Sequence, residues 1–393
     1  MSVKKMSLPM IATAALLVQL ALPASVHAAV PLVPAVRAVG NIEPVYQFKS
    51  GPMPTGVTVS AKGRIFVNFP RWGDDVPFTV GEIRNGAVVA YPSQTANTFD
   101  PAKPADTLSS VQSVVVDALD RLWILDPAAP GFQTRIAGAA KLVAVDLGSN
   151  KIVKTIIIPA TVALDTTYLN DVRFDLRVGK AGVAYITDSS LSGPGGIIVV
   201  DLDSGHSWRK LTGHPSTSVD TTFVPFVEGE RLAQRAPGKA PQPFAVASDG
   251  IALSSDGATL FYSPLSSRHL FSVPTKLLLD DTANDAALSA AVRDLGEKGA
   301  SDGMEADDKG RLYASDYEHN SIHRRQPDGQ WTTIASDPRM SWPDTLSVGP
   351  DGYLYFTANQ LNRQAGFHEG KDLRQKPYML FRVRIDAGPV MLK

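Results

Sequence analysis

The chain contains no cysteine among its 393 residues. It can therefore form no disulfide, no thiolate metal site and no lipid-modified amino-terminal cysteine, and it cannot use a cysteine nucleophile. Charge of either sign is also not in excess, with 38 Lys and Arg residues against 39 Asp and Glu residues. A formal net charge of −1 argues against binding to nucleic acid or to an anionic membrane surface.

Long apolar runs are also scarce, and the one segment that could be a targeting signal or a membrane anchor lies at the amino terminus. Two lysines precede an apolar stretch at residues 10–22, and small residues around Ala28 fit a cleavage site. This order predicts a signal peptide at residues 1–28. A membrane anchor is the alternative, but the stretch is shorter than the roughly 20 residues that a bilayer requires. We expect a secreted or periplasmic protein without membrane attachment after signal removal, and residues 29–40 as an amino-terminal arm.

Familiar catalytic motifs and helical periodicity are equally scarce. The chain has neither the His-Glu-x-x-His pattern of zinc proteases nor the Gly-x-Ser-x-Gly elbow of serine hydrolases. His319 and His323 lie in a predicted hairpin, where a spacing of four does not place them on one face, so we interpret them as surface residues. Strand signals dominate after residue 40, and the best predicted helix covers residues 282–295.

What the chain does have is a short pattern that occurs six times: a polar residue, two or three mostly apolar residues, a turn with Gly or Asp, and an apolar strand. Its average spacing is about 58 residues, from 289 positions over five intervals, which suits a four-stranded sheet and is too long for a helical hairpin. The sequence therefore predicts an all-β protein, a six-bladed β-propeller formed by residues 41–393 as a single domain. The copies open at Thr55, Gln112, Asn170, Asp249, Asp302 and Asp344.

A propeller places equivalent residues of all its blades around one central channel. If the pattern marks the innermost strands, its opening residues form a ring at one mouth of that channel. Asp249, Asp302 and Asp344 would then converge, and like charges held this close favour protonation or a neutralising cation. The fold thus predicts an acidic, polar site.

The oxygen atoms of this ring suit a divalent cation such as Ca²⁺, Mg²⁺, Mn²⁺ or Zn²⁺. We expect one such ion, held by Asn170, Asp249, Asp302 and Asp344, and no organic cofactor. A metal there would polarise an ester or lactone carbonyl, while Asp302 or Asp249 transfers the proton and Gln112 orients the substrate. The alternative is that Asp and Asn at strand starts only satisfy backbone donors in tight turns.

A second interpretation of the same ring is a binding site without catalysis. Phe69, Trp72 and Trp342 follow or precede strands of the repeats, and they would stack on a small aromatic amine. Packing between blades is the competing explanation for these three side chains. Both interpretations give the protein a small-molecule partner, and they leave its oligomeric state open.

Several segments along the chain resemble, in order, the signatures of the major royal jelly/yellow family. The resemblance covers residues 42–385 and implies a secreted six-bladed propeller. It also implies either binding of small aromatic amines in the channel or dopachrome-type tautomerisation, since members of that family have been linked to both. The segments are Phe69-Pro70-Arg71-Trp72, Asp120-Arg121-Leu122-Trp123, Tyr168-Leu169-Asn170-Asp171, Ala184-Tyr185-Ile186-Thr187-Asp188, Ser207-Trp208-Arg209, Gly250-Ile251-Ala252-Leu253-Ser254 and Trp342-Pro343-Asp344.

The chain is also similar, more distantly, to the gluconolactonase/SMP-30 propellers, which hold one divalent cation and open lactones. Asn170-Asp171 matches that family's substrate-side Asn-Asp, and Asp302-Gly303-Met304 matches its metal-binding Asp-Gly-Met. The family's first-blade glutamate falls at Thr55 and its asparagine ligand at Asp249, so Asp344 would have to restore the missing charge. The leading expectation is therefore an acidic channel site for a divalent cation and a small ligand, with metal-dependent lactone or ester hydrolysis as its activity if the protein is an enzyme, and with the amine binder and the tautomerase as alternatives.

Overall fold

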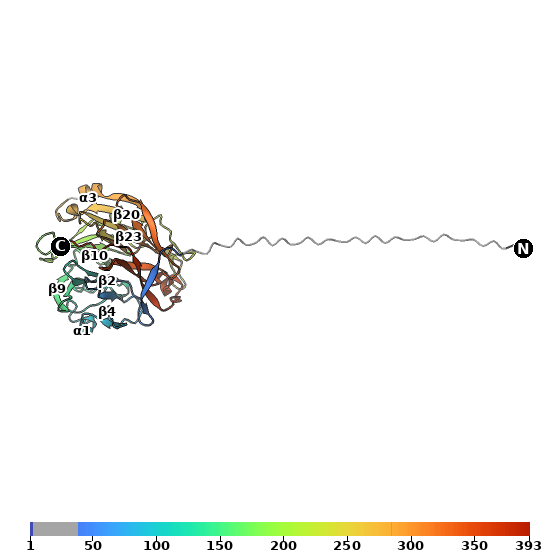
Figure 1. Ribbon diagram of the computed structural model, residues 1–393, viewed down its shortest axis with the longest axis horizontal. Helices are drawn as coiled ribbons and strands as arrows, with labels where there is room; N and C mark the ends of the chain where they lie inside the picture. Colours follow the sequence, from blue (N-terminus) through green and yellow to red (C-terminus); the bar gives the residue numbers. More distant parts are fainter. Residues whose placement is uncertain (3–37, 284) are drawn as a thin grey trace. The chain divides into compact units, whose positions relative to one another are not determined.

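The computed structural model describes residues 1–2, 38–283 and 285–393. The predicted signal peptide beyond its first two residues, and the arm up to residue 37, lie outside the described residues. In the described part of the chain, six four-stranded antiparallel sheets form the blades of a propeller (Figure 1). The predicted six-bladed fold is confirmed.

The sheets follow one another along the chain, and each runs from the channel outward in sequence order, except that the last blade takes its outermost strand from the start of the chain. The innermost strands of blades 1 to 6 are β2 (Val57–Val59), β6 (Ser113–Val116), β10 (Leu169–Asp175), β18 (Ser248–Leu253), β22 (Met304–Ala306) and β26 (Pro343–Val348).

The outer strands of the blades pair antiparallel with these. In blades 1 to 3 they are β3 (Ile65–Asn68), β4 (Val80–Arg84), β5 (Ala87–Ala90), β7 (Arg121–Asp126), β8 (Lys141–Asp146), β9 (Lys151–Ile157), β11 (Val183–Asp188), β12 (Gly196–Asp201) and β13 (Ser207–Lys210). In blades 4 to 6 they are β19 (Thr259–Pro264), β20 (His269–Pro274), β21 (Arg293–Glu297), β23 (Leu312–Asp316), β24 (Ser321–Arg325), β25 (Trp331–Ser336), β27 (Tyr353–Ala358), β28 (Tyr378–Arg384) and β1 (Ile42–Phe48).

The ring of blades closes in two places. At the channel, each innermost strand contacts its neighbours, and β2 of blade 1 contacts β26 of blade 6. At the outside, β1 pairs with β28 in a register from Ile42 opposite Val383 to Phe48 opposite Tyr378. The two ends of the propeller sequence therefore share blade 6, which ties the last blade to the first.

The turn residue of the repeat is Gly or Asp because the backbone there is left-handed. Gly63 and Gly310 have φ values of +75° and +73°, and Asp120 adopts +58°. Glycine reaches this region without strain, and Asp is among the residues that tolerate it. The Asp residues just before these turns close them with their side chains. Asp117, for example, accepts hydrogen bonds from the backbone of Leu119 and Arg121.

The apolar residue that follows each turn packs between blades. Phe66 lies in one buried cluster with Val114 and Leu122 of blade 2, and Trp123 lies in another with Val172 of blade 3. Fully burying such a side chain contributes about 1.5 to 3 kcal/mol. The same kind of contact recurs between successive blades, which explains why an apolar residue follows the turn in each copy of the repeat.

Two segments between strands differ from simple loops. The predicted helix at residues 282–295 is shorter, as α3 (Asp285–Ala291), and the chain continues into β21, the outer strand of blade 4. The helix thus lies within blade 4, between β20 and β21. Between blades 3 and 4, residues 215–243 form an insertion with two small hairpins. Their strands are β14 (Phe226–Val227), β15 (Glu230–Arg231), β16 (Ala233–Gln234) and β17 (Gln242–Pro243).

The remaining helical segments are short. They are α1 (Gln94–Asn97), α2 (Thr275–Leu278), and the 3₁₀ turns η1 (Pro130–Phe132), η2 (Pro215–Thr217), η3 (Leu361–Arg363) and η4 (Ala365–Phe367). Among the described residues, no helix is long and apolar enough to cross a bilayer.

Candidate functional site: an acidic cavity in the channel

The opening residues of the repeats lie at the channel end of the innermost strands. Asn170, Asp249 and Asp344 are the second residues of β10, β18 and β26, while Gln112 and Asp302 come shortly before β6 and β22. All five line one cavity of about 450 Å³. The structure therefore brings together five of the six opening residues.

Bonds from the preceding blade fix the backbone at several of these positions. In each case a side chain on the second strand of one blade donates to the carbonyl of the opening residue of the next blade. The opening side chains are thereby held toward the channel. The bonds are Thr357 Oγ1 to Thr55 O (2.6 Å), Asn68 Nδ2 to Gln112 O (2.9 Å) and Thr187 Oγ1 to Asp249 O (2.6 Å).

A directional chain of side-chain hydrogen bonds begins at the cavity wall. Trp72 Nε1 donates to Tyr168 Oη (2.8 Å), and Tyr168 Oη donates to Gln112 Oε1 (3.0 Å). Gln112 Nε2 in turn donates to Asn170 Oδ1 (2.7 Å). Because the Trp72 indole can only donate, the single proton of the Tyr168 hydroxyl is donated onward, and the amides of Gln112 and Asn170 have defined orientations.

The chain continues to the first carboxylate. Asn170 Nδ2 donates to Ser189 Oγ (2.8 Å), and Ser189 Oγ lies 3.0 Å from Asp249 Oδ2 and 2.7 Å from the Ser248 carbonyl. The oxygen of Asn170 that was expected to bind a metal is thus occupied by Gln112. The network positions Asp249 through neutral groups only.

The other two carboxylates also have neutral partners. Trp342 Nε1 donates to Asp302 Oδ2 (2.7 Å), and Asn359 Nδ2 donates to Asp344 Oδ2 (2.6 Å). Within the described ranges, no Lys, Arg or His forms an ion pair with Asp249, Asp302 or Asp344 (the carboxylate trio). The negative charge of the trio is therefore not balanced by direct ion pairs.

The pKa values of all three carboxyl groups are raised. Burial raises the pKa of Asp249 and of Asp344 well above the usual value, and the charge of Asp302 raises both further. Burial also raises the pKa of Asp302 to about 6, although the Trp342 hydrogen bond acts in the opposite direction. A bound cation would favour the ionised forms of all three.

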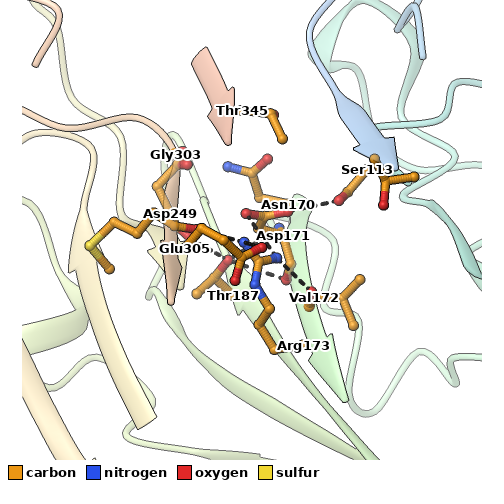
Figure 2. A network of polar contacts seen from close by, with 12 residues as sticks. Ser113, Asn170, Asp171, Val172, Arg173, Thr187, Asp249, Gly303, Glu305 and Thr345 are labelled. Atoms are coloured by element: carbon orange, nitrogen blue, oxygen red, sulfur yellow. Dashed lines mark hydrogen bonds and ion pairs between the residues drawn. The ribbon is translucent and has the colours of Figure 1, made fainter. Parts of the chain in front are cut away.

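A buried arginine on β10 is neutralised by other groups. Arg173 Nη1 lies 3.4 Å from Asp171 Oδ2, and Arg173 Nη2 lies 3.5 Å from Glu305 Oε2. Figure 2 shows these three side chains directed toward one another, with Ser113 donating to Asp171 (2.7 Å). Arg173 and Glu305 line a second cavity of about 330 Å³, not the one that holds the trio.

The wall of the acidic cavity is aromatic. Trp72 and Phe132 stack with ring centroids 4.9 Å apart, and Phe132 and Tyr168 are 5.0 Å apart. Phe244 and Phe367 also line the cavity and contact each other edge to face at 5.6 Å. The site thus combines an acidic group of side chains with a large apolar surface.

The residues fit a divalent metal in chemistry but not in arrangement. Carboxylate and amide oxygens are suitable ligands for Ca²⁺ or Mg²⁺. Among the described residues, however, no three His, Cys, Asp or Glu side chains converge closely enough to hold a metal ion.

Two of the aromatic residues expected to contact a ligand are placed elsewhere. Phe69 is 3% exposed, packs against Phe48 and Phe78 in the core and does not line the cavity. Trp342 is fully buried and stacks on Tyr317 at 4.2 Å, so its indole supports Asp302 instead of lining the cavity. Both side chains therefore pack in the protein interior and do not face a ligand. Of the three aromatic residues expected to stack on a ligand, Trp72 is the one that lines the cavity.

Other cavity residues did not emerge from the sequence. Tyr168 immediately precedes the Leu169-Asn170 pair, and this position near an opening residue could have identified it as a cavity residue. Phe132, Phe244 and Arg235 lie in segments between strands. No periodicity marks such positions, because loop geometry is not repeated from blade to blade.

The histidine interpretation needs correction. His319 Nδ1 and His323 Nε2 both lie near Asp316 Oδ2, at 2.9 Å and 3.1 Å. His319 is in the turn between β23 and β24, and this turn brings it back over the carboxylate. The two rings therefore share one partner, although His319 is exposed as expected.

Comparison with known proteins agrees with the fold and the repeat. A family model described as "Major royal jelly protein" matches residues 109–388. Major royal jelly protein 7 of Apis mellifera is 30% identical over 229 residues, which are 55% of this chain and 46% of that protein. Protein yellow of Drosophila erecta is 26% identical over 239 residues, 56% of this chain and 41% of that protein. The match spans less than half the length of these relatives.

Solved structures resemble the chain in fold. A calcium-binding protein, regucalcin, from Agrobacterium tumefaciens has a TM-score of 0.53 at 14% identity and covers 88% of this chain and 96% of its own. A gluconolactonase from Xanthomonas campestris has a TM-score of 0.50 at 14% identity, covering 90% and 99%. With the family match spanning most of the propeller, from blade 2 to the end of blade 6, the chain belongs to the major royal jelly protein family.

Proposed function

We propose that the channel cavity binds a small organic cation, a primary amine on an apolar or aromatic body, and that this binding is the protein's function. The observation that carries the proposal is a buried carboxylate trio without a direct ion pair, inside a cavity with an aromatic wall. An ammonium group would supply a direct positive partner and three hydrogen-bond donors. The aromatic residues suit the rest of the molecule.

The electrostatic part of the proposal depends on burial. An ion pair at an exposed site contributes little, whereas the trio is largely shielded from water, with Asp249 5% and Asp302 8% exposed. Hydrogen bonds to charged groups contribute about 1.5 to 3 kcal/mol each. Loss of one carboxylate should therefore weaken binding by a factor of about ten to a hundred.

A second candidate is the metal-dependent lactone or ester hydrolase expected from the sequence. The trio supports it, because repulsion among the carboxylates would also be relieved by a divalent cation held by Asp249, Asp302 and Asp344. The ion would polarise a carbonyl group, and Asp249 or Asp302 would hold the transferred proton. Asn170 enters this site only if its oxygen is released from Gln112.

One calorimetric experiment separates the two candidates. Phenylethylamine, and separately Ca²⁺ and Mg²⁺, are titrated into the chelator-treated protein, its Asp249→Asn variant and its Asp302→Asn variant. We expect the amine to bind without metal and to lose about tenfold or more in affinity in each variant. Asp203→Asn is the matched control, since it removes the same charge from an exposed carboxylate paired with Lys180.

Each outcome has a defined meaning. Binding of one divalent ion per chain that depends on Asp249, together with no amine binding, would replace the amine proposal by the hydrolase and call for a lactone screen. Equal amine binding in all variants would place the amine outside the cavity and contradict the proposal.

We also propose that the chain is exported. The support is the order of residues 1–28, in which two lysines precede an apolar stretch and small residues, as in a signal peptide. Amino-terminal sequencing of protein recovered outside the producing cell tests this, and a chain that retains residues 1–28 and stays inside would contradict it.

A further inference from the structure

The lining of the acidic cavity contains one exception to its negative charge. Among the described residues that line it, Arg235 is the one basic side chain. It belongs to the insertion between blades 3 and 4 and follows β16, whereas the trio lies on or beside the innermost strands. The cavity therefore has positive and negative groups on different structural elements.

The charge of Arg235 is not used by the protein itself. Its guanidinium donates only to carbonyl oxygens, Nη2 to Arg231 O (3.0 Å) and Nη1 to Phe367 O (3.4 Å). In the described part of the chain no carboxylate pairs with it. Nearby arginines are different, since Arg363 pairs with Glu228 and Arg374 pairs with Asp74.

The backbone holds Arg235 in place from both sides. Its amide donates to the Gly366 carbonyl (2.8 Å), and its own carbonyl accepts from the Glu369 amide (3.0 Å). These bonds join the insertion to the loop of blade 6 that contains η4 (Ala365–Phe367). The backbone of Arg235 is therefore fixed at the cavity lining, and its guanidinium is bound by the Arg231 and Phe367 carbonyl oxygens.

We propose that the cavity selects a zwitterion, a molecule whose ammonium group binds the trio while a carboxylate at its other end binds Arg235. This inference rests on the proposed amine binding and names its ligand class. Arg235 forms no direct ion pair with Asp249, Asp302 or Asp344, so the two binding groups are farther apart than contacting charges. The ligand therefore has to bridge two separate charged groups, and an ω-amino acid, which carries its charges at opposite ends of an apolar body, is the ligand class that we infer.

The chemistry of the guanidinium supports this assignment. An arginine presents several donors in one plane and binds a carboxylate through two of them. A carboxylate in a largely acidic cavity would otherwise be repelled, so Arg235 decides whether a negatively charged end is accepted. The aromatic side chains that line the same cavity suit a benzene ring as the connecting body.

The test compares 4-(aminomethyl)benzoate with benzylamine by calorimetry at low salt. We expect the wild type to bind the zwitterion about tenfold or more tightly than the amine. In Arg235→Gln this ratio should fall to within about twofold, and Arg235→Lys should restore part of it. Arg231→Gln is the matched control. Arg231 lies four residues before Arg235 and carries the same charge, but it does not line the acidic cavity. Its ratio should stay at the wild-type value.

The outcomes distinguish this inference from the function on which it rests. If benzylamine binds and depends on Asp249 while the zwitterion has no advantage, the zwitterion proposal is overturned and amine binding stands. If Arg231→Gln lowers the ratio as much as Arg235→Gln, general surface charge explains the preference and the proposal is again overturned. If neither compound binds the wild type, amine binding itself fails and the inference fails with it. Thermal unfolding of each variant shows whether it is folded.

Discussion

Asp302 is held by a tryptophan whose own backbone is strained. Trp342 has φ of +55°, a region that bulky residues rarely adopt, and it is fully buried against Tyr317. Its indole donates to Asp302 at 2.7 Å. The surrounding packing thus maintains an unfavourable conformation that directs one donor at one carboxylate. Such strain is often found at functional sites.

The raised pKa of Asp302 makes stability depend on pH in an unusual direction. A carboxyl with a folded pKa of about 6 and an unfolded pKa of about 3.9 binds more protons when folded, so ligand-free protein should lose stability as pH rises from about 4 to about 6. Asp249 and Asp344, whose pKa values are also raised, act in the same direction. When the pKa of a group is higher by 1 in the folded chain than in the unfolded chain, the free energy of unfolding changes by about 1.4 kcal/mol across the titration.

Thermal unfolding between pH 5 and pH 8 checks this prediction. We expect Asp302→Asn, which carries no charge at any of these pH values, to be stabilised relative to the wild type at pH 8 and less so at pH 5. Asp203→Asn is the control and should follow the wild type. Parallel curves for Asp302→Asn and the wild type would show that Asp302 has an ordinary pKa.

At the scale of elements, the loop after β7 carries an exposed aromatic side chain into the cavity. Within five residues, Ala128, Gly131 and Phe132 have φ values of +53°, +63° and +56°. Hydrogen bonds from Gly131 to the Arg71 carbonyl and from Ile136 to the Ala128 carbonyl hold this loop. Phe132 stays 43% exposed while it stacks on Trp72, so its ring is available to a ligand.

This arrangement predicts that Phe132→Ala weakens binding of phenylethylamine by about threefold to tenfold, since an aromatic pair contributes about 0.5 to 1.5 kcal/mol. Binding of an aliphatic amine such as hexylamine should change less. Phe226→Ala is the matched control, because Phe226 is 53% exposed in β14 and does not line the cavity. An equal loss for both amines, or for both variants, would contradict a ring-binding role of Phe132.

At the scale of the whole molecule, the closure of the ring depends on a strand far away in sequence. β1 contributes the outermost strand of blade 6 and buries Ile42 and Phe48, which are 6% and 3% exposed. Burial of two such side chains contributes about 3 to 6 kcal/mol. A chain that begins at residue 50 should therefore unfold at clearly lower urea concentration than one that begins at residue 38.

Urea unfolding followed by tryptophan fluorescence measures this difference. The chain beginning at residue 38 retains every described strand and serves as the control. Equal midpoints for the two chains would mean that the contacts at the channel alone close the ring.

The sequence by itself determined the blade architecture and the acidic ring. Both depend on local rules repeated at a fixed spacing: a left-handed turn needs Gly or Asp, and the residue that opens the innermost strand recurs in each blade. Asp249, Asp302 and Asp344 could therefore be assigned to one site although 95 positions separate the first from the last. These three residues line one cavity because they occupy equivalent positions in blades arranged around a common channel. The repeat predicts this without any knowledge of individual contacts.

Only the tertiary structure decided which other side chains reach that cavity. Phe69 and Trp342 are close to repeat strands yet pack in the core, while Phe132 and Arg235 come from loops and line the site. Loop positions do not repeat between blades, so their placement depends on contacts such as that of Arg235 with Gly366, 131 residues away in sequence. The charge of the ring was therefore fixed by local sequence, whereas its aromatic wall and the arginine in its lining were fixed by long-range packing.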